Sequence, residues 1–230
     1  MICSGNFNLG DKMRKNFLAA ILLALFFAGC TRQPSETNLE KWETSTDEEV
    51  VKSKEEISKN AISLLMPQCE DYDMNACNDA GANFEFLKDY ANAFKLYEKA
   101  CDGGVELGCA NLGLLYESGL GVQKDPRKAI ELYKNGCNKG GAHSCYNLGN
   151  AYRKGEIVAQ DYQLAMSAYV NACEAGDVPS CANIGAMYEL GLGVEKDEMK
   201  AYHIYKVACF RGLNKACPQM KRLGQKLGQN

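Results

Sequence analysis

Ten of the chain's 12 cysteines fall into five pairs, and the two members of each pair are separated by seven residues. The pairs are Cys69 and Cys77, Cys101 and Cys109, Cys137 and Cys145, Cys173 and Cys181, and Cys209 and Cys217. The last four pairs follow one another at intervals of 36 residues, and the first precedes the second by 32. A fixed period of this length is typical of stacked arrays, in which each unit buries its apolar face against its neighbours. The spacing therefore restricts the chain to a repeat architecture.

Within one period the sequence predicts two helices joined by a glycine-containing loop. Cys109, Leu112 and Leu115 recur at helical spacing, and Gly119 supplies the backbone freedom of a helix end. Asp125 then offers an N-cap for the second helix, with Pro126 at its first position. Equivalent residues recur in the other units. We therefore predict an all-α fold, a right-handed α/α solenoid.

A glycine recurs in the middle of each first helix, at Gly113, Gly149 and Gly185. Glycine within a helix costs about 0.5–1 kcal/mol relative to alanine. Its recurrence predicts that a neighbouring helix crosses at close range at this point.

The cysteine pairs are predicted to form disulfides across the corners between helices. Two residues eight positions apart on one helix are about 12 Å apart, whereas a disulfide needs α-carbons about 4.4–6.8 Å apart. Each pair must therefore straddle a corner, as Cys137 and Cys145 do. The competing scheme joins the two ends of one hairpin, such as Cys109 and Cys137, but its spacing varies and it leaves Cys69 and Cys217 unpaired. Five corner disulfides, each worth about 2–3 kcal/mol, are the prediction.

The first 30 residues are predicted to be a signal peptide, with Met13 as the expected start. Basic residues precede an apolar run from Phe17 to Ala28, which is too short to span a bilayer as a helix. The run ends in Phe-Ala-Gly-Cys, which resembles a bacterial lipobox and makes Cys30 the expected lipid anchor. Ordinary signal-peptidase cleavage and free secretion are the alternative. Both alternatives place the mature chain outside the cytoplasm, either as a periplasmic or outer-membrane lipoprotein or as a secreted protein.

The remaining chain divides into a tether and the array. Residues 31–46 contain few apolar side chains and are predicted to be flexible. Residues 47–230 are expected to form about five repeats including partial ends, beginning with an amphipathic helix that ends near Pro67. The net charge of −3 argues against nucleic-acid binding, which needs a clustered excess of Lys and Arg. Because the chain has 2 histidines and no Cys-x-x-Cys, we expect no metal and no cofactor. We also expect the protein to be a monomer.

The unit CANLGLLYESGLGVQKDPRKAIELYKNGC resembles the Sel-one-like repeat, a relative of the tetratricopeptide repeat. The cysteine at each end is similar to the Helicobacter cysteine-rich proteins, a secreted subgroup. The resemblance covers roughly residues 54–230. Its motifs are specific because LG-x-x-Y, G-x-G-V-x-x-D, the alanine four residues past that aspartate and the cysteine pair coincide in register. The chain departs from the pattern at Ile157, which replaces the second loop glycine, and at Gly136, which replaces a small helical residue.

The resemblance implies an activity, since these cysteine-rich proteins have been classed as β-lactamases or penicillin-binding proteins. The residues supply no mechanism for it, and catalytic residues stay unassigned. No serine has a lysine three residues on, and His143 and His203 lie in different repeats. Ser144 and Ser180, each directly before a cysteine, are interpreted as surface positions at a corner.

The first helices of the repeats are expected to line a concave groove. Asn111, Asn147 and Asn183 recur at one position of these helices, with Asp79 in the short first copy. An amide carries both a donor and an acceptor and can clamp the backbone of an extended peptide; bracing of a neighbouring loop is an equally supported interpretation.

Two functions therefore compete. The favoured one is an exported, lipid-anchored interaction module that binds a peptide, a protein or a cell-wall fragment in its groove. The alternative, carried by the resemblance alone, is a β-lactam-hydrolysing or penicillin-binding protein.

Overall fold

The computed structural model describes residues 47–229, and within this range the chain is helical and contains no strand. The helices are α3 (Asp47–Glu70), α4 (Met74–Phe86), α5 (Tyr90–Asp102), α6 (Glu106–Ser118), α7 (Pro126–Asn138), α8 (Ala142–Lys154), α9 (Tyr162–Glu174), α10 (Val178–Leu190), α11 (Glu198–Phe210), the 3-10 helix η2 (Asn214–Ala216) and α12 (Cys217–Leu227). The predicted signal peptide, Cys30 and the tether lie outside the described residues. No helix in the described part of the chain is both long and apolar enough to cross a bilayer.

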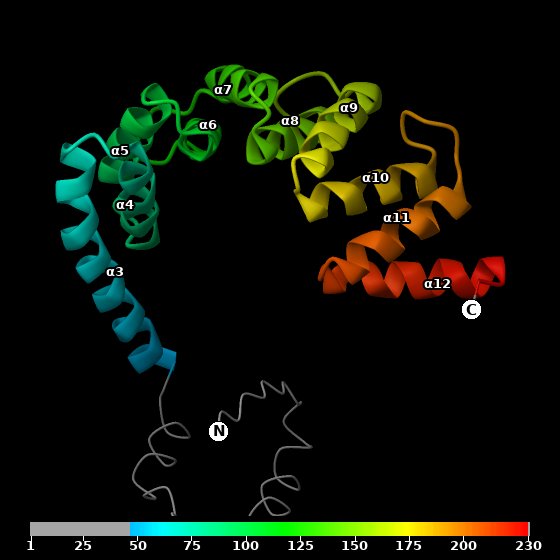
Figure 1. The fold of residues 1–230 in the computed structure, drawn as a ribbon. Helices are drawn as coiled ribbons and strands as arrows, with labels where there is room; N and C mark the ends of the chain where they lie inside the picture. The colour runs from blue at the N-terminus through cyan, green and yellow to red at the C-terminus, as the bar shows by residue number, and fades with distance from the viewer. Residues whose placement is uncertain (1–46, 230) are drawn as a thin grey trace, which may run out of the picture. The chain divides into compact units, whose positions relative to one another are not determined.

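The helices form four hairpins in sequence, which we number as repeats 1 to 4: α4 with α5, α6 with α7, α8 with α9, and α10 with α11 (Figure 1). Each hairpin packs on the next through its second helix, because α5 contacts α6, α7 contacts α8 and α9 contacts α10. Helix α6 also contacts α8, and α7 contacts α9. The first helices thus form one layer and the second helices another, which confirms the predicted all-α solenoid.

The helix ends follow the predicted signals. Each second helix is N-capped by an aspartate whose carboxylate accepts a backbone N–H of the first turn; these caps are Asp89, Asp125, Asp161 and Asp197. The first helices of repeats 2, 3 and 4 end at a glycine in the left-handed conformation, namely Gly119, Gly155 and Gly191. A residue without a Cβ adopts this conformation without strain, so the chain can turn into the loop at this point.

Within each repeat the two helices cross at the mid-helix glycine. A Cβ added to Gly113 would lie 2.4 Å from the ring of Tyr133, and one added to Gly149 would lie 2.7 Å from the ring of Tyr169. These tyrosine rings are fully buried. The glycine therefore leaves the space that the tyrosine fills, as the sequence predicts.

Within residues 47–229 five disulfides are present, and they join the pairs that the spacing predicts. In each pair the first cysteine ends a second helix, or α3, and the other opens the following helix. The two α-carbons lie 4.5–5.0 Å apart. Every corner between consecutive units is therefore closed by a covalent bond.

Two local expectations are wrong. Helix α3 does not end near Pro67 but continues through it to Glu70, which places Cys69 in the last helical turn, buried and bonded to Cys77. Ser144 and Ser180 are not surface positions, because both are fully buried. A Cβ added to Gly136 would lie 2.2 Å from the hydroxyl oxygen of Ser144. The unusual glycine at position 136 thus makes room for that serine.

Candidate functional site

The four residues predicted to bind a ligand lie at one register position of the first-helix layer, on α4, α6, α8 and α10. They are not equivalent. Asn111 Nδ2 donates to Asn78 Oδ1 at 3.1 Å, and Asn78 Nδ2 donates to Asp79 Oδ1 at 3.1 Å. Since Asn78 is buried on α4 and Asn111 belongs to α6, this chain of bonds joins repeats 1 and 2. In these two repeats the polar position braces a neighbouring helix, and not a neighbouring loop as the second interpretation expected.

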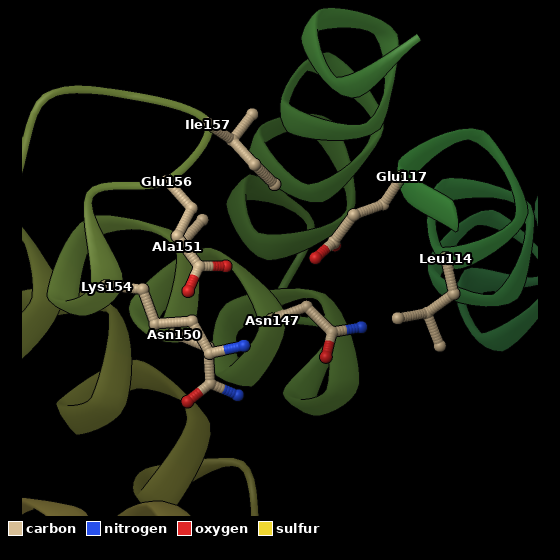
Figure 2. Close-up of a pocket in the computed structure, with 8 residues that line it drawn as sticks. All are labelled: Leu114, Glu117, Asn147, Asn150, Ala151, Lys154, Glu156 and Ile157. Carbon is tan, nitrogen blue, oxygen red and sulfur yellow. The ribbon is translucent and has the colours of Figure 1, made fainter. Parts of the chain in front are cut away.

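Asn147 has a different environment, because it lines a small pocket between α6 and α8. The pocket has a volume of about 120 Å³. Its walls are Leu114 and Glu117 of α6, Asn147, Asn150, Ala151 and Lys154 of α8, and Glu156 and Ile157 of the loop that follows α8. Figure 2 shows Glu117 reaching from the α6 side toward Asn147 and Asn150 on α8. Of the four predicted residues, Asn147 is the one that this pocket contains.

Buried tyrosines hold two of the polar walls in place. Tyr133 Oη donates to Glu117 Oε2 at 2.9 Å, and Tyr169 Oη donates to Asn150 Oδ1 at 2.8 Å. The second bond occupies the amide oxygen of Asn150 and directs its Nδ2 group away from Tyr169. Both walls are therefore preorganised by bonds from the second helix of their own repeat.

The tyrosine hydroxyls remain donors over a wide range of pH. Burial raises the pKa of Tyr133, and the charge of Glu117 raises it further. Burial also raises the pKa of Tyr169, although Arg153 acts in the opposite direction. At neutral pH each hydroxyl is protonated and supplies a hydrogen bond without a charge of its own.

Repeat 3 differs from the other repeats at the residue that faces this tyrosine. Glu85, Glu117 and Glu189 occupy the position in repeats 1, 2 and 4, whereas repeat 3 has Arg153. Arg153 Nε donates to Tyr169 Oη at 3.1 Å. The first-helix layer therefore changes from a carboxylate to a guanidinium at this position.

The loop of repeat 3 also differs, and it supplies two walls that the sequence reasoning did not assign to a site. In repeats 2 and 4 the second loop glycine, Gly121 or Gly193, has a φ of +70° and approaches the start of the preceding second helix so closely that a Cβ would collide with it. Ile157 occupies this position in repeat 3 without adopting a positive φ. Instead it packs against the core and lines the pocket. The interrupted glycine pattern was the signal that could have located the pocket.

The walls of the pocket carry polar groups that suit the binding of a ligand. Its walls carry carboxylates, amides and one ammonium group, but no serine, cysteine or histidine. Within the described residues no group of three potential metal ligands is close enough to hold an ion. Carboxylate, amide and ammonium groups together suit a polar ligand that offers both hydrogen-bond donors and acceptors.

Comparisons with known proteins agree with the repeat architecture. Residues 80–105, 107–141, 142–177 and 178–212 match the profile of the Sel1 repeat, which together is more than half of the chain. A Sel1 repeat protein from Oxalobacter formigenes has a similar structure, with 31% sequence identity, a TM-score of 0.64, and coverage of 68% of this chain and 65% of that one. The structure of c5321, a protective antigen present in uropathogenic Escherichia coli strains and displaying an SLR fold, is similar at 25% identity and a TM-score of 0.59, over 79% of this chain and 42% of that one.

Helicobacter pylori cysteine-rich protein B shares 29% identity over 56% of this chain and 93% of its own, with a TM-score of 0.47. The present chain spans about two thirds of the Oxalobacter protein and less than half of the E. coli antigen. A direct comparison with curated proteins finds no match.

Proposed function

Because this chain belongs to the Sel1 repeat family, whose repeats stack into an extended surface, we propose that it is an interaction module that binds an extended segment of a peptide or protein along its first-helix layer. The observation that carries this proposal is the pocket between α6 and α8, where Asn147 and Asn150 are available from one side and Glu117 from the other. Side-chain amides and carboxylates at fixed positions can pair with the N–H and C=O groups of an extended backbone.

We also propose that the module acts outside the cytoplasm as a monomer, attached to a membrane through Cys30. Five disulfides are typical of extracytoplasmic proteins, since cytosolic thiols are kept reduced. The lipid anchor is tested by substituting Cys30→Ala in cells that express the full chain. Loss of incorporated labelled fatty acid and release from the membrane fraction support the anchor, and unchanged partitioning contradicts it.

Peptide binding is tested by selecting a displayed library of random peptides on the oxidised, purified chain. The affinity of an enriched peptide is then measured for the unsubstituted chain and for two variants. Asn147→Ala is expected to weaken binding by about tenfold, because it removes the donor and the acceptor of this amide from the pocket wall. Asn111→Ala serves as the matched control, since its amide is bonded to Asn78. It is expected to lower thermal stability and leave the affinity nearly unchanged.

Two outcomes contradict the proposal. One is a selection that enriches no peptide. The other is an enriched peptide whose affinity responds equally to Asn147→Ala and Asn111→Ala, because the asparagines then act only through stability.

Hydrolysis of a β-lactam, which the resemblance to the cysteine-rich subgroup implies, remains a prediction without a specific structural observation in its favour. Ser144 and Ser180 are fully buried and cannot be reached by a substrate. Turnover of a chromogenic cephalosporin by repurified, refolded protein, in proportion to its concentration, is the result that supports the enzymatic alternative.

A further inference from the structure

The charges of the first helices change sign between α6 and α8. Helices α4 and α6 contain acidic residues and no lysine or arginine; the acidic residues are Asp79, Glu85, Glu106 and Glu117. Helix α8 contains Arg153 and Lys154 and no aspartate or glutamate. The pocket lies at this boundary, with Glu117 of α6 on one wall. The other wall carries Lys154 of α8 and Glu156 of the loop that follows α8.

Some charged groups of the first helices cap a helix or form an ion pair, whereas others bond only to neutral tyrosine hydroxyls. Glu106 Oε1 accepts the backbone N–H of Ser144, and Glu189 of α10 pairs with Arg222. Glu85 and Glu117 instead accept only tyrosine hydroxyls, at 2.7 and 2.9 Å. Arg153 likewise donates to the hydroxyl of Tyr169. Among the ion pairs of the described residues, none includes these three side chains or Lys154.

The pocket has room for the methylene groups of a lysine or arginine side chain beside the carboxylate of Glu117. Leu114, Ala151 and Ile157 give it apolar walls, and Glu117 is fixed by Tyr133. Lysine and arginine bury their methylene groups on apolar surface while the charged head stays at a polar rim. On the α8 side, the Nδ2 group of Asn150 and the ammonium of Lys154 are donors suited to a carboxylate.

We propose that the ligand of this surface is an extended peptide with its charges in two blocks, in which lysine or arginine side chains lie over α4 and α6 and a carboxylate lies over α8. This inference rests on the proposed function and specifies the ligand of the same site. The sign of the ligand's charge changes at the pocket, where a cationic side chain meets Glu117. Complementary charges accelerate association and disfavour peptides that place like charges together.

The test uses synthetic peptides of one composition, with equal numbers of lysines and glutamates among neutral residues. Two have the charges in blocks, in either order, and a third alternates them. Because the three have the same net charge, a difference in affinity reports the charge pattern alone. One block peptide is expected to bind about tenfold more tightly than the alternating peptide, and the difference is expected to shrink at high salt.

A charge-swapped variant provides the decisive comparison. Glu117→Lys combined with Lys154→Glu exchanges the charges that α6 and α8 present to the pocket, and it is expected to reverse the preference between the two block orders. The matched control is Lys128→Glu combined with Glu131→Lys, which exchanges an exposed ion pair on the second helix α7. The control is expected to keep the original preference, because these residues belong to the other layer.

The inference is overturned if the block peptides bind no better than the alternating peptide, including the case in which none binds, or if the control swap alters the preference as much as the pocket swap. A library-selected peptide that still binds through Asn147 then shows that peptide binding stands without the charge pattern. If the selection also fails, the proposed function fails with it.

Discussion

The backbone N–H of Ser144, in the first turn of α8, donates a 3.0 Å hydrogen bond to Oε1 of Glu106, which begins α6 and lies 38 positions earlier. Helices α4 and α10 are capped by the aspartates that precede them, Asp73 and Asp177. At α8 the preceding residue is Gly141, which has no side chain, and the carboxylate of the previous repeat takes over. The N-terminus of α8 is therefore capped by its neighbour.

Removing this inter-repeat cap is expected to destabilise the array. Glu106→Ala should lower the free energy of unfolding by about 1 kcal/mol, as measured by urea denaturation with the disulfides intact. Gly141→Ala should also destabilise, because its Cβ would lie 2.0 Å from Cγ of Glu106. The two changes are expected to be non-additive, since Glu106→Ala removes the atoms that the new Cβ strikes. Asp177→Ala removes a cap within one repeat and should be additive with Gly141→Ala; equal coupling in both pairs would contradict this account.

The mid-helix glycines are expected to differ in their tolerance of alanine. A Cβ at Gly113 would lie 2.4 Å from the ring of Tyr133, whereas a Cβ at Gly185 would lie 3.1 Å from Tyr205. Gly113→Ala should lower the free energy of unfolding by about 1–3 kcal/mol, because the added Cβ overpacks the crossing. At Gly185 the gain in helix propensity, about 1 kcal/mol, should offset most of the smaller strain. Thermal unfolding of both variants checks which one loses more stability, and a larger loss for Gly185→Ala would contradict the prediction.

The five disulfides are expected to open in an order set by access to the reductant. Cys69 and Cys77 are fully buried, while Cys209 and Cys217 are both partly exposed. Because a thiolate must reach a sulfur atom to open the bond, limited reduction should release Cys209 and Cys217 first. Alkylation followed by peptide mass analysis identifies the opened pair. Early labelling of Cys69 would show that local unfolding of α3, and not static burial, controls the order.

Alkaline pH is expected to weaken the array through its buried tyrosines. Burial, and then Glu189, raise the pKa of Tyr205 to about 12 from the ordinary value of 10.0. A folded-state pKa above the unfolded value means that the contribution to stability is complete below about pH 10 and is lost as the pH rises through about 12. The free energy of unfolding should therefore fall between these values, and Tyr205→Phe should reduce the slope. Tyr72→Phe, at an exposed ring, is the control and should leave the slope unchanged.

The solenoid and its disulfides could be predicted from the sequence because both depend on spacing. An unvarying interval between Cys137 and Cys145, with helix caps such as Asp125 in register, defines helices and corners without reference to distant contacts. Pro67 misled the prediction, because a local helix-breaking preference is outweighed when the last turn holds a buried, bonded cysteine.

The pocket depends on differences between repeats, whereas a periodic sequence pattern describes only what the repeats share. Asn111 and Asn147 occupy the same register position, yet Asn111 meets Asn78 of the previous repeat and Asn147 lines a cavity. The partner at position 78 and the isoleucine at position 157 decide these roles. Neither effect is visible until the repeats are stacked in three dimensions.

Because Ser144 of repeat 3 bonds to Glu106 of repeat 2, the stability of the array depends on the order of its repeats. A unit that begins with Gly141 and Ala142 is incomplete by itself and must follow a unit whose first helix opens with glutamate. Moving repeat 3 elsewhere in the array would leave α8 uncapped, so repeat 3 has to follow repeat 2 directly. A designer who wished to lengthen or shuffle this protein would have to cut at other junctions, such as the one before Asp177, where the incoming unit brings its own cap.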